Sequence, residues 1–268
     1  MKTESKKPSG KVFLVGAGPG DIDLLTVKAA RLLGQADVVL IDDLAGSAVV
    51  ALCPQARIIH VGKRGGCKST PQSFIERLLV REAKQGRHVV RLKGGDPSVF
   101  GRSGEEIAAL ERAGIDYEIV PGVSSGVAAA AQLGVSLTHR DHAQGVAFIT
   151  AHGIEGAAVP WQALARGNLT LVVYMGVARA ASLRQSLLDG GMPPQTPVIA
   201  VENVSSAESR SIVATIGSML TEFDTAELKS PAVIVIGEAM RARAASLATR
   251  ALSERDCAAT STIAARLA

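Results

Sequence analysis

The sequence predicts an α/β fold with two domains whose sheets are mainly parallel or mixed. Short apolar runs alternate with helical patterns in two successive blocks. The alternation is interrupted once, by the sequence THRDH at residues 138–142. A chain of 268 residues is long enough for two modest domains. We expect a disordered tail at 1–10, an N-terminal domain at 11–138, a linker at 139–145, a C-terminal domain at 146–240 and a weakly ordered tail at 241–268.

The first block contains five short apolar runs that are typical of buried strands. They lie at residues 12–15, 37–41, 57–61, 89–92 and 117–120. Helical patterns follow at 24–33, with Asp21 as the expected N-cap, at 74–85, from Ser103 onward, and in an alanine-rich stretch after Ser124 and Ser125.

The second block repeats the alternation after residue 145. Strands are expected at 146–150, 169–175, 197–201 and 232–236, with a hairpin that includes 211–216, and helices at 161–166 and 178–189. The uncharged stretch at 119–138 is long enough to cross a membrane, but Pro121, its glycines and its alanines indicate a strand, a turn and a helix instead.

Composition excludes several classes of function. The formal charge of +4 agrees with an anionic small molecule, and the basic residues are too dispersed to indicate nucleic-acid binding. The three cysteines share no metal-like or CxxC spacing, so we expect reduced thiols in the cytoplasm. The first residues contain no apolar segment of the kind found in signal peptides.

The bend at residues 93–97, Lys-Gly-Gly-Asp-Pro, carries the first functional hypothesis. Two adjacent glycines let a ligand lie against main-chain atoms, Asp96 offers only acceptors, and Pro97 has no N–H to donate. The bend therefore suits a ligand with amino or hydroxyl donors better than a phosphate. The alternative is a tight turn with no ligand.

The bend at 16–21, Gly-Ala-Gly-Pro-Gly-Asp, invites comparison with the dinucleotide-binding fingerprint. Asp21 occupies the position of the third glycine, and Pro19 removes a backbone N–H from the turn that would hold a pyrophosphate. These two residues argue against nicotinamide or flavin binding.

Two further clusters are candidates for a site. Lys63, Arg64 and Lys68 form either a solvated surface or a group that binds substrate carboxylates. His139 and His142 suggest a metal, but no third ligand has a suitable spacing, so we expect none.

Taken together, the motifs resemble those of the tetrapyrrole methylase family. They are GAGPGD at 16–21, GKRGG at 62–66, PQ at 71–72, RLKGGDPSVFGR at 91–102, VPGVSS at 120–125, LTHRDHAQ at 137–144, YMG at 174–176 and SPA at 230–232. The narrower GKR and THRD motifs are most similar to the branch that methylates uroporphyrinogen III.

The resemblance implies two α/β domains with the cofactor in the cleft between them, usually in a homodimer, with no metal, membrane or nucleic acid. It implies transfer of two methyl groups from S-adenosylmethionine to uroporphyrinogen III. The products would be precorrin-2, formed by way of precorrin-1, and S-adenosylhomocysteine. Cobalamin, sirohaem and haem d1 synthesis share this step. The alternatives are a methylase of a later corrin precursor and a non-catalytic tetrapyrrole-binding module.

The resemblance also implies roles for individual residues. Cofactor contacts map onto Pro19, Gly94, Gly95, Asp96, Val99, Ser124, Ser125, Met175, Val204 and Ala232. Val204 stands where relatives have glycine or alanine. Asp42 maps onto a proton acceptor and Lys63 onto a proton donor, although Asp43 next to Asp42 leaves open which acid faces the substrate. The candidates for binding the substrate's carboxylates are Arg102, Lys63, Arg64 and Lys68. Arg102 is also a candidate catalytic residue.

Overall fold

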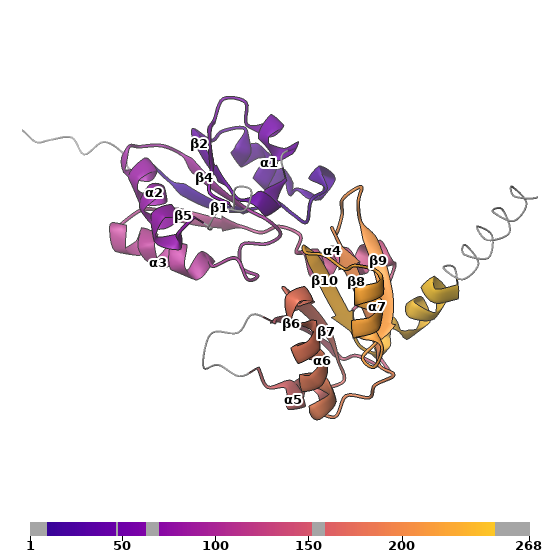
Figure 1. Cartoon of the computed structure of the whole chain (residues 1–268). Helices are drawn as coiled ribbons and strands as arrows, with labels where there is room; N and C mark the ends of the chain where they lie inside the picture. The colour runs from indigo at the N-terminus through magenta and orange to yellow at the C-terminus, as the bar shows by residue number, and fades with distance from the viewer. Residues whose placement is uncertain (1–9, 47, 63–69, 152–158, 250–268) are drawn as a thin grey trace, which may run out of the picture. The chain divides into compact units, whose positions relative to one another are not determined.

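The structure is a computed structural model that describes residues 10–46, 48–62, 70–151 and 159–249 (Figure 1). The chain divides into two compact units, Met1–Ser125 and Gly126–Ala268. This division comes earlier than the linker expected at 139–145. Residues there form a turn closed by an antiparallel bridge between His139 and Ala143, directly before the first strand of the second sheet.

The first unit contains a five-stranded sheet in the order β3-β2-β4-β1-β5. Every pairing in it is parallel, as the sequence predicted. The strands are β1 (Val12–Gly16), β2 (Val38–Ile41), β3 (Arg57–His60), β4 (Val89–Lys93) and β5 (Tyr117–Val120). Because all five run in one direction, the bends that follow them share one edge of the sheet.

Helices cover both faces of this sheet. Phe13 and Val15 of β1 pack on the side of α1 (Val27–Leu33), whereas Val12 and Leu14 pack on the side of α2 (Gln72–Lys84) and α3 (Ser103–Ala113). This alternation follows from the two-residue period of a strand. In β4 the same period places Val90 and Leu92 on the α1 side.

The start of α1 differs from the sequence prediction. Asp21 caps only a short 3-10 helix, η1 (Ile22–Leu24), by accepting the amide of Asp23. Leu25 is then extended, and Thr26 caps α1 by accepting the amide of Ala29 at 3.2 Å. The sequence thus holds two capping residues in succession, and the second one starts the helix. The 3-10 segments η2 (Asp43–Ala45) and η3 (Ala48–Leu52) were also not predicted.

The second unit contains a mixed sheet in the order β6-β7-β10-β8-β9. Its strands are β6 (Gly145–Thr150), β7 (Leu169–Tyr174), β8 (Pro197–Glu202), β9 (Arg210–Thr215) and β10 (Ala232–Ile236). Only β6 and β7 are parallel, so a mainly parallel sheet is wrong for this unit and a mixed one is right. The expected hairpin is confirmed as β8 and β9. Strand direction depends on how the connections fold back, which local periodicity does not encode.

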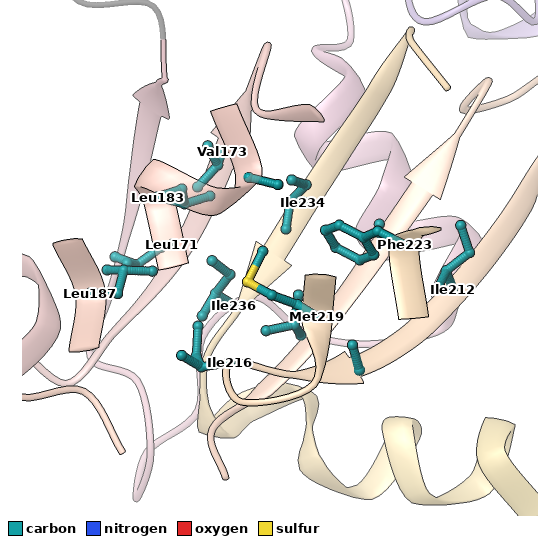
Figure 2. Close-up of a cluster of buried hydrophobic side chains, with 14 of the residues drawn as sticks. Leu171, Val173, Leu183, Leu187, Ile212, Ile216, Met219, Phe223, Ile234 and Ile236 are labelled. Atoms are coloured by element: carbon teal, nitrogen blue, oxygen red, sulfur yellow. The ribbon is translucent and has the colours of Figure 1, made fainter. Parts of the chain in front are cut away.

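Four named helices accompany this sheet: α4 (Ser125–Leu133), α5 (Trp161–Arg166), α6 (Ala180–Asp189) and α7 (Met219–Thr225). Figure 2 shows Met219 and Phe223 of α7, which was not predicted, in one apolar cluster with Ile234 of β10 and Leu183 of α6. On the opposite face, a Cβ on Gly126 of α4 would lie 2.5 Å from Val172 of β7, so this helix packs closely against the strand.

The C-terminal tail was expected to be a weak helix, and residues 241–249 are helical. The rest of that tail, and residues 1–9 of the N-terminal tail, lie outside the described part of the chain. Across the described ranges, every helix is too short or too polar to span a lipid bilayer.

Candidate functional site

The bends after β1, β4 and β5 meet backbone to backbone at the edge of the first sheet. Gly18 and Gly95 form an antiparallel bridge, with N–O distances of 3.2 and 2.7 Å. A Cβ on Gly16 would lie 2.6 Å from the carbonyl oxygen of Gly95, and one on Gly122 would overlap the same oxygen. Only glycine fits at these two positions. The glycines of the three motifs therefore allow the three bends to pack closely at one junction.

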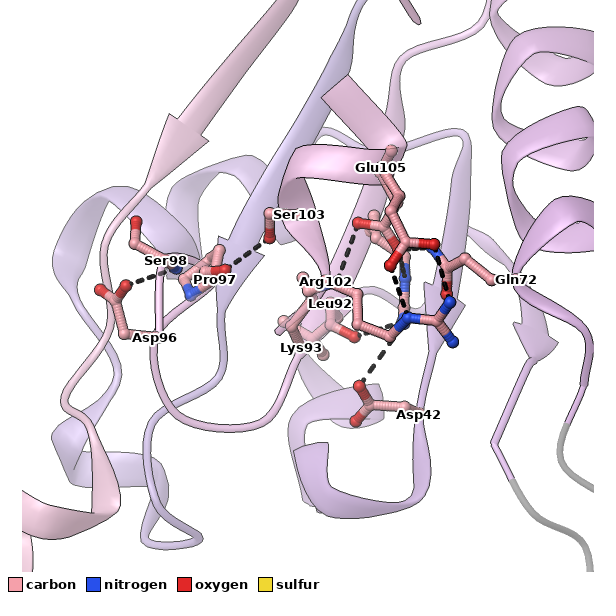
Figure 3. Close-up of polar contacts among 12 residues, drawn as sticks. Asp42, Gln72, Leu92, Lys93, Asp96, Pro97, Ser98, Arg102, Ser103 and Glu105 are labelled. Atoms are coloured by element: carbon pink, nitrogen blue, oxygen red, sulfur yellow. Dashed lines mark hydrogen bonds and ion pairs between the residues drawn. The ribbon is translucent and has the colours of Figure 1, made fainter. Parts of the chain in front are cut away.

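Asp96 fastens this junction with both carboxylate oxygens. Oδ2 accepts the amide of Gly122 at 3.0 Å, and Oδ1 accepts the amide of Ser98 at 2.7 Å. Figure 3 shows the second contact, and beside it the hydroxyl of Ser103 donating to the carbonyl of Pro97. From the sequence, Asp96 was expected to offer acceptors to a ligand. In the structure its acceptors also hold the GGDP bend in shape.

Gly95 marks the open side of this junction. Its φ of +68° is left-handed. A Cβ there would lie 3.8 Å from Cα of Ser124 and 3.9 Å from N of Ser125, which is ordinary contact distance. Pro19 follows the bridged Gly18, and the amide of Val99 donates to the carbonyl of Asp96 at 3.1 Å. The structure therefore brings together the residues of the first unit that were expected to bind the cofactor.

Gly94 lies against Leu44 instead of the bends after β1 and β5. A Cβ on it would lie 2.7 Å from Cβ of Leu44, whose side chain is 64% exposed. Leu44 belongs to η2, which follows β2 and Asp42. The segment that carries the predicted proton acceptor therefore lies against the GGDP bend.

A buried group of charges lies beneath Asp42. Arg91 and Lys93 of β4 are 5% and 3% exposed, and Glu106 of α3 is fully buried. Lys93 Nζ lies 2.8 Å from Glu106 Oε2, and Arg91 Nε lies 3.1 Å from Glu106 Oε1. Arg91 Nη2 also reaches Asp42 Oδ2 at 3.6 Å. We call Arg91, Lys93 and Glu106 the buried triad.

The buried triad was not predicted from the sequence, because residues 89–92 were interpreted as an apolar strand. The signal was present: Arg91 and Lys93 alternate with Val90 and Leu92, so one face of a central strand carries two cations. Charges in that position need a buried partner, and the apolar face of the following helix contains an acid, Glu106.

Asp42 is a partly buried acid, with 26% of its side chain exposed. Burial raises its pKa, while the charges of Arg91 and Lys93 and the amides of Gly94 and Leu44 oppose that rise. Its Oδ1 atom is buried and has no hydrogen-bond partner among the described residues. Burial, followed by the charge of Arg91, lowers the pKa of Lys93, against the opposing charges of Glu106 and Asp42.

The neighbouring acid, Asp43, is placed differently. It is exposed, and a Cβ on Gly62 would overlap its carboxylate. Asp43 thus lies against the start of the glycine-bordered bend after β3, whereas Asp42 lies beside the buried triad.

Arg102 lies directly before α3 with a left-handed φ of 55°. Its Nε and Nη2 atoms each lie 2.7 Å from a carboxylate oxygen of Glu105, and 59% of its side chain is exposed. The hydrogen bond to Glu105 raises the pKa of Arg102 further. The other expected substrate-binding residues, Lys63, Arg64 and Lys68, lie outside the described ranges.

The second unit gathers Met175, Val204 and Ala232 at one edge of its sheet. β10 runs antiparallel to both β7 and β8, with Val233 opposite Tyr174 and Ala232 opposite Glu202. The carboxyl ends of β7 and β8 therefore meet the first residue of β10. Met175 has a φ of +54° and is 47% exposed, and Val204 is buried.

The histidines of the THRDH segment stack on each other, with ring centroids 4.6 Å apart. Within the described ranges, no three His, Cys, Asp or Glu side chains are grouped so that they could hold a metal ion.

Comparison with known proteins places this arrangement in a family. The family model for tetrapyrrole (corrin/porphyrin) methylases matches residues 11–220. A uroporphyrinogen-III C-methyltransferase of Pseudomonas aeruginosa is 53% identical over 233 residues, which cover 87% of this chain and 95% of that protein. A sirohaem synthase of Azotobacter vinelandii is 45% identical over 239 residues, which are 88% of this chain and 52% of that protein.

Among solved structures, a uroporphyrin-III C-methyltransferase of Thermus thermophilus, crystallised with S-adenosylhomocysteine, superposes with a TM-score of 0.76. It is 42% identical, and the match covers 87% of this chain and all of that one. The expected family is thereby confirmed: the chain belongs to the tetrapyrrole (corrin/porphyrin) methylases.

Proposed function

We propose that this protein is an S-adenosylmethionine-dependent methyltransferase that adds two methyl groups to uroporphyrinogen III and forms precorrin-2 by way of precorrin-1. The observation that carries the proposal is the junction of the bends after β1, β4 and β5, with Asp96 at its centre. The relatives named for this reaction match nearly the whole length of the described chain.

The junction suits a cofactor without phosphates. Gly95 leaves open space beside Ser124 and Ser125 that a side chain would occupy, and Pro19 contributes no N–H. In the first unit, the proposed contacts are Pro19, Gly94, Gly95, Asp96, Val99, Ser124 and Ser125. In the second unit, they are Met175, Val204 and Ala232. When bound, S-adenosylmethionine supplies a methyl group activated by a positively charged sulfur.

The protein's main task in this reaction is positioning. An electron-rich pyrrole carbon of the substrate is itself a nucleophile, so the site has to hold that carbon in line with the methyl group and exclude water. We propose that Arg102, Lys63, Arg64 and Lys68 bind the substrate's carboxylates. The exposure of 59% of the Arg102 side chain supports its part, because the guanidinium has five N–H donors and Glu105 uses only two of its nitrogens.

Methylation of a ring carbon also requires a proton to leave the substrate. We propose Asp42 as the acceptor and Lys63 as a donor. The unpartnered Oδ1 of Asp42 supports the first role, since it is an acceptor held away from water. The raised pKa of this acid also brings its basicity closer to neutral pH.

The oligomeric state, the cellular compartment and the pathway of the product are also proposals. A homodimer in the cytoplasm follows from the resemblance, and the free thiol of Cys53 agrees with a reducing compartment. The likeness to sirohaem synthases favours sirohaem as one destination of the product, with cobalamin and haem d1 as further ones.

Incubation with methyl-labelled S-adenosylmethionine and uroporphyrinogen III tests the function. We expect two labels in each tetrapyrrole, with a singly labelled intermediate at early times. Tight cofactor binding with no label in the tetrapyrrole would indicate a binding module instead. Heat protection by a nicotinamide dinucleotide, in the absence of protection by S-adenosylmethionine, would favour an oxidoreductase.

A further inference from the structure

Glu106 is the most deeply buried acid next to the proposed site. It lies in the first turn of α3 with no exposed surface. Its two oxygens receive three donors: Lys93 Nζ at 2.8 Å, Arg91 Nε at 3.1 Å and Gln72 Nε2 at 3.3 Å. A buried carboxylate with donors on both oxygens is held in one position.

Arg91 is hydrogen-bonded to Glu106 but only ion-paired, at a longer distance, with Asp42. Its Nε atom is hydrogen-bonded to Glu106, and one of its terminal nitrogens donates to the carbonyl of Leu92 at 2.9 Å. Its other terminal nitrogen lies 3.6 Å from Asp42 Oδ2, which is too long for a hydrogen bond. Glu106 therefore holds the Nε atom of the guanidinium, while Nη2 points to Asp42, so Arg91 cannot present both of these nitrogens to the Asp42 carboxylate.

The charges of the buried triad do not cancel. Arg91 and Lys93 carry two positive charges, and Glu106 carries one negative charge. One net positive charge therefore faces Asp42. Without the carboxylate of Glu106, two would face it.

We infer that Glu106 is a positioning residue for Asp42: it cancels one of the two positive charges beside that acid and keeps Arg91 from closing onto its carboxylate. This inference rests on the proposed function, in which Asp42 accepts a proton. A carboxylate paired fully with Arg91 would be a weaker base, because its ionised form would be stabilised.

Other charged groups lie in the same region. On its own segment, Asp42 is followed by the exposed Asp43. Directly before α3, Arg102 is ion-paired with Glu105 of that helix. The described charges that act directly on the pKa of Asp42 are Arg91 and Lys93, both from β4. Glu106 is hydrogen-bonded to both Arg91 and Lys93. Removing the charge of Glu106 should therefore alter the pKa of Asp42 through these two cations.

The test is the titration of Asp42 in the full-length, ligand-free protein. Aspartate is labelled with 13C at the carboxyl carbon, and the Asp42 signal is identified by its absence from the Asp42→Asn variant. In Glu106→Gln we expect the pKa of Asp42 to fall by about one unit or more, the usual effect of an added neighbouring positive charge. An unchanged or higher value overturns the inference.

A second variant keeps the test decisive if Glu106→Gln does not fold. Lys93→Met removes one cation and leaves Glu106 bonded to Arg91 and Gln72. It should raise the pKa of Asp42, and an unchanged or lower value would count against the inference.

Glu82→Gln is the matched control. Glu82 is 1% exposed and is ion-paired with Arg57, Arg81 and Arg87, but these partners lie at the opposite end of the sheet from Asp42. This variant should leave the titration of Asp42 where it is in the unmodified protein. A shift equal to that of Glu106→Gln would mean that the loss of any buried carboxylate has the same effect.

The pH dependence of methyl transfer gives a separate readout. In Glu106→Gln the acidic limb of the rate profile should move to lower pH, in the same direction as the titration. If the unmodified protein transfers no methyl group at any pH, the proposed function fails, while the titrations still decide whether Glu106 controls Asp42.

Discussion

Asp96 accepts a hydrogen bond from the amide of Gly122 at 3.0 Å, and this contact ties the bend after β4 to the bend after β5. The same carboxylate accepts the amide of Ser98. Two bends that lie far apart in the sequence are thus held by one side chain at the junction that we propose binds the cofactor.

Asp96→Asn should loosen the junction, because an amide has one acceptor oxygen where the carboxylate has two. We expect a loss of about 1 to 3 kcal/mol in the free energy of unfolding, measured by urea titration, and weaker S-adenosylmethionine binding, measured by calorimetry. Asp37→Asn is the control, since Asp37 accepts a single amide, that of His88, before β2 and β4 begin. Unaltered cofactor affinity in Asp96→Asn would remove Asp96 from the site.

Gly95→Ala should weaken cofactor binding at least tenfold while the protein still folds. The new Cβ has room within the protein but projects into the space beside Ser124 and Ser125. The left-handed φ adds about 1 to 2 kcal/mol of strain once a Cβ is present. Gly114→Ala carries similar strain, at φ +64° and with nothing within 4 Å, and should bind the cofactor normally. Equal affinity in the two variants would make the Gly95 bend purely structural.

Asp42→Asn should lower the methyl-transfer rate by about 10² to 10⁴, the usual range for loss of a general base. Asp43→Asn, the same chemical change one residue later, should have a small effect because that acid is exposed and lies against Gly62. Single-turnover rates with bound cofactor separate this step from binding. The reverse ranking would assign the proton to Asp43.

Arg102→Ala should raise KM for the tetrapyrrole and leave the S-adenosylmethionine affinity unchanged. The ion pair with Glu105 is exposed, so its loss should change stability by less than about 1 kcal/mol. Arg241→Ala breaks a pair of the same geometry with Glu238 in the second unit. If both variants methylate the substrate normally, Arg102 has no part in substrate binding.

Glu118→Gln should destabilise the protein in a pH-dependent way. Hydrogen bonds from Lys11 and Lys28 lower the pKa of Glu118 from 4.5 to about 2. Because the folded pKa is depressed, this stabilisation is present above pH 4.5 and is lost as the pH falls toward 2. The difference in Tm between the two proteins should shrink over that range. It should also shrink in high salt, since the three side chains are partly exposed.

The family and most secondary-structure elements could be predicted because their signals are local. An apolar run between polar bends indicates a strand wherever it pairs, and Tyr117–Val120, Trp161–Arg166 and Ala232–Ile236 have the predicted bounds. The short helix α7 escaped prediction because only its packing against the second sheet makes Met219 and Phe223 a buried face.

The sequence by itself determined the alternation of strands and helices, the glycine bends at the strand ends and the motifs of the family. The tertiary structure decided the antiparallel course of β10, the double use of Asp96 and the burial of Glu106 between Arg91 and Lys93. The physical reason is the distance along the chain over which each kind of interaction acts. Periodicity and turn chemistry act over a few neighbouring residues, whereas a buried charge is tolerated only where partners from other elements meet it.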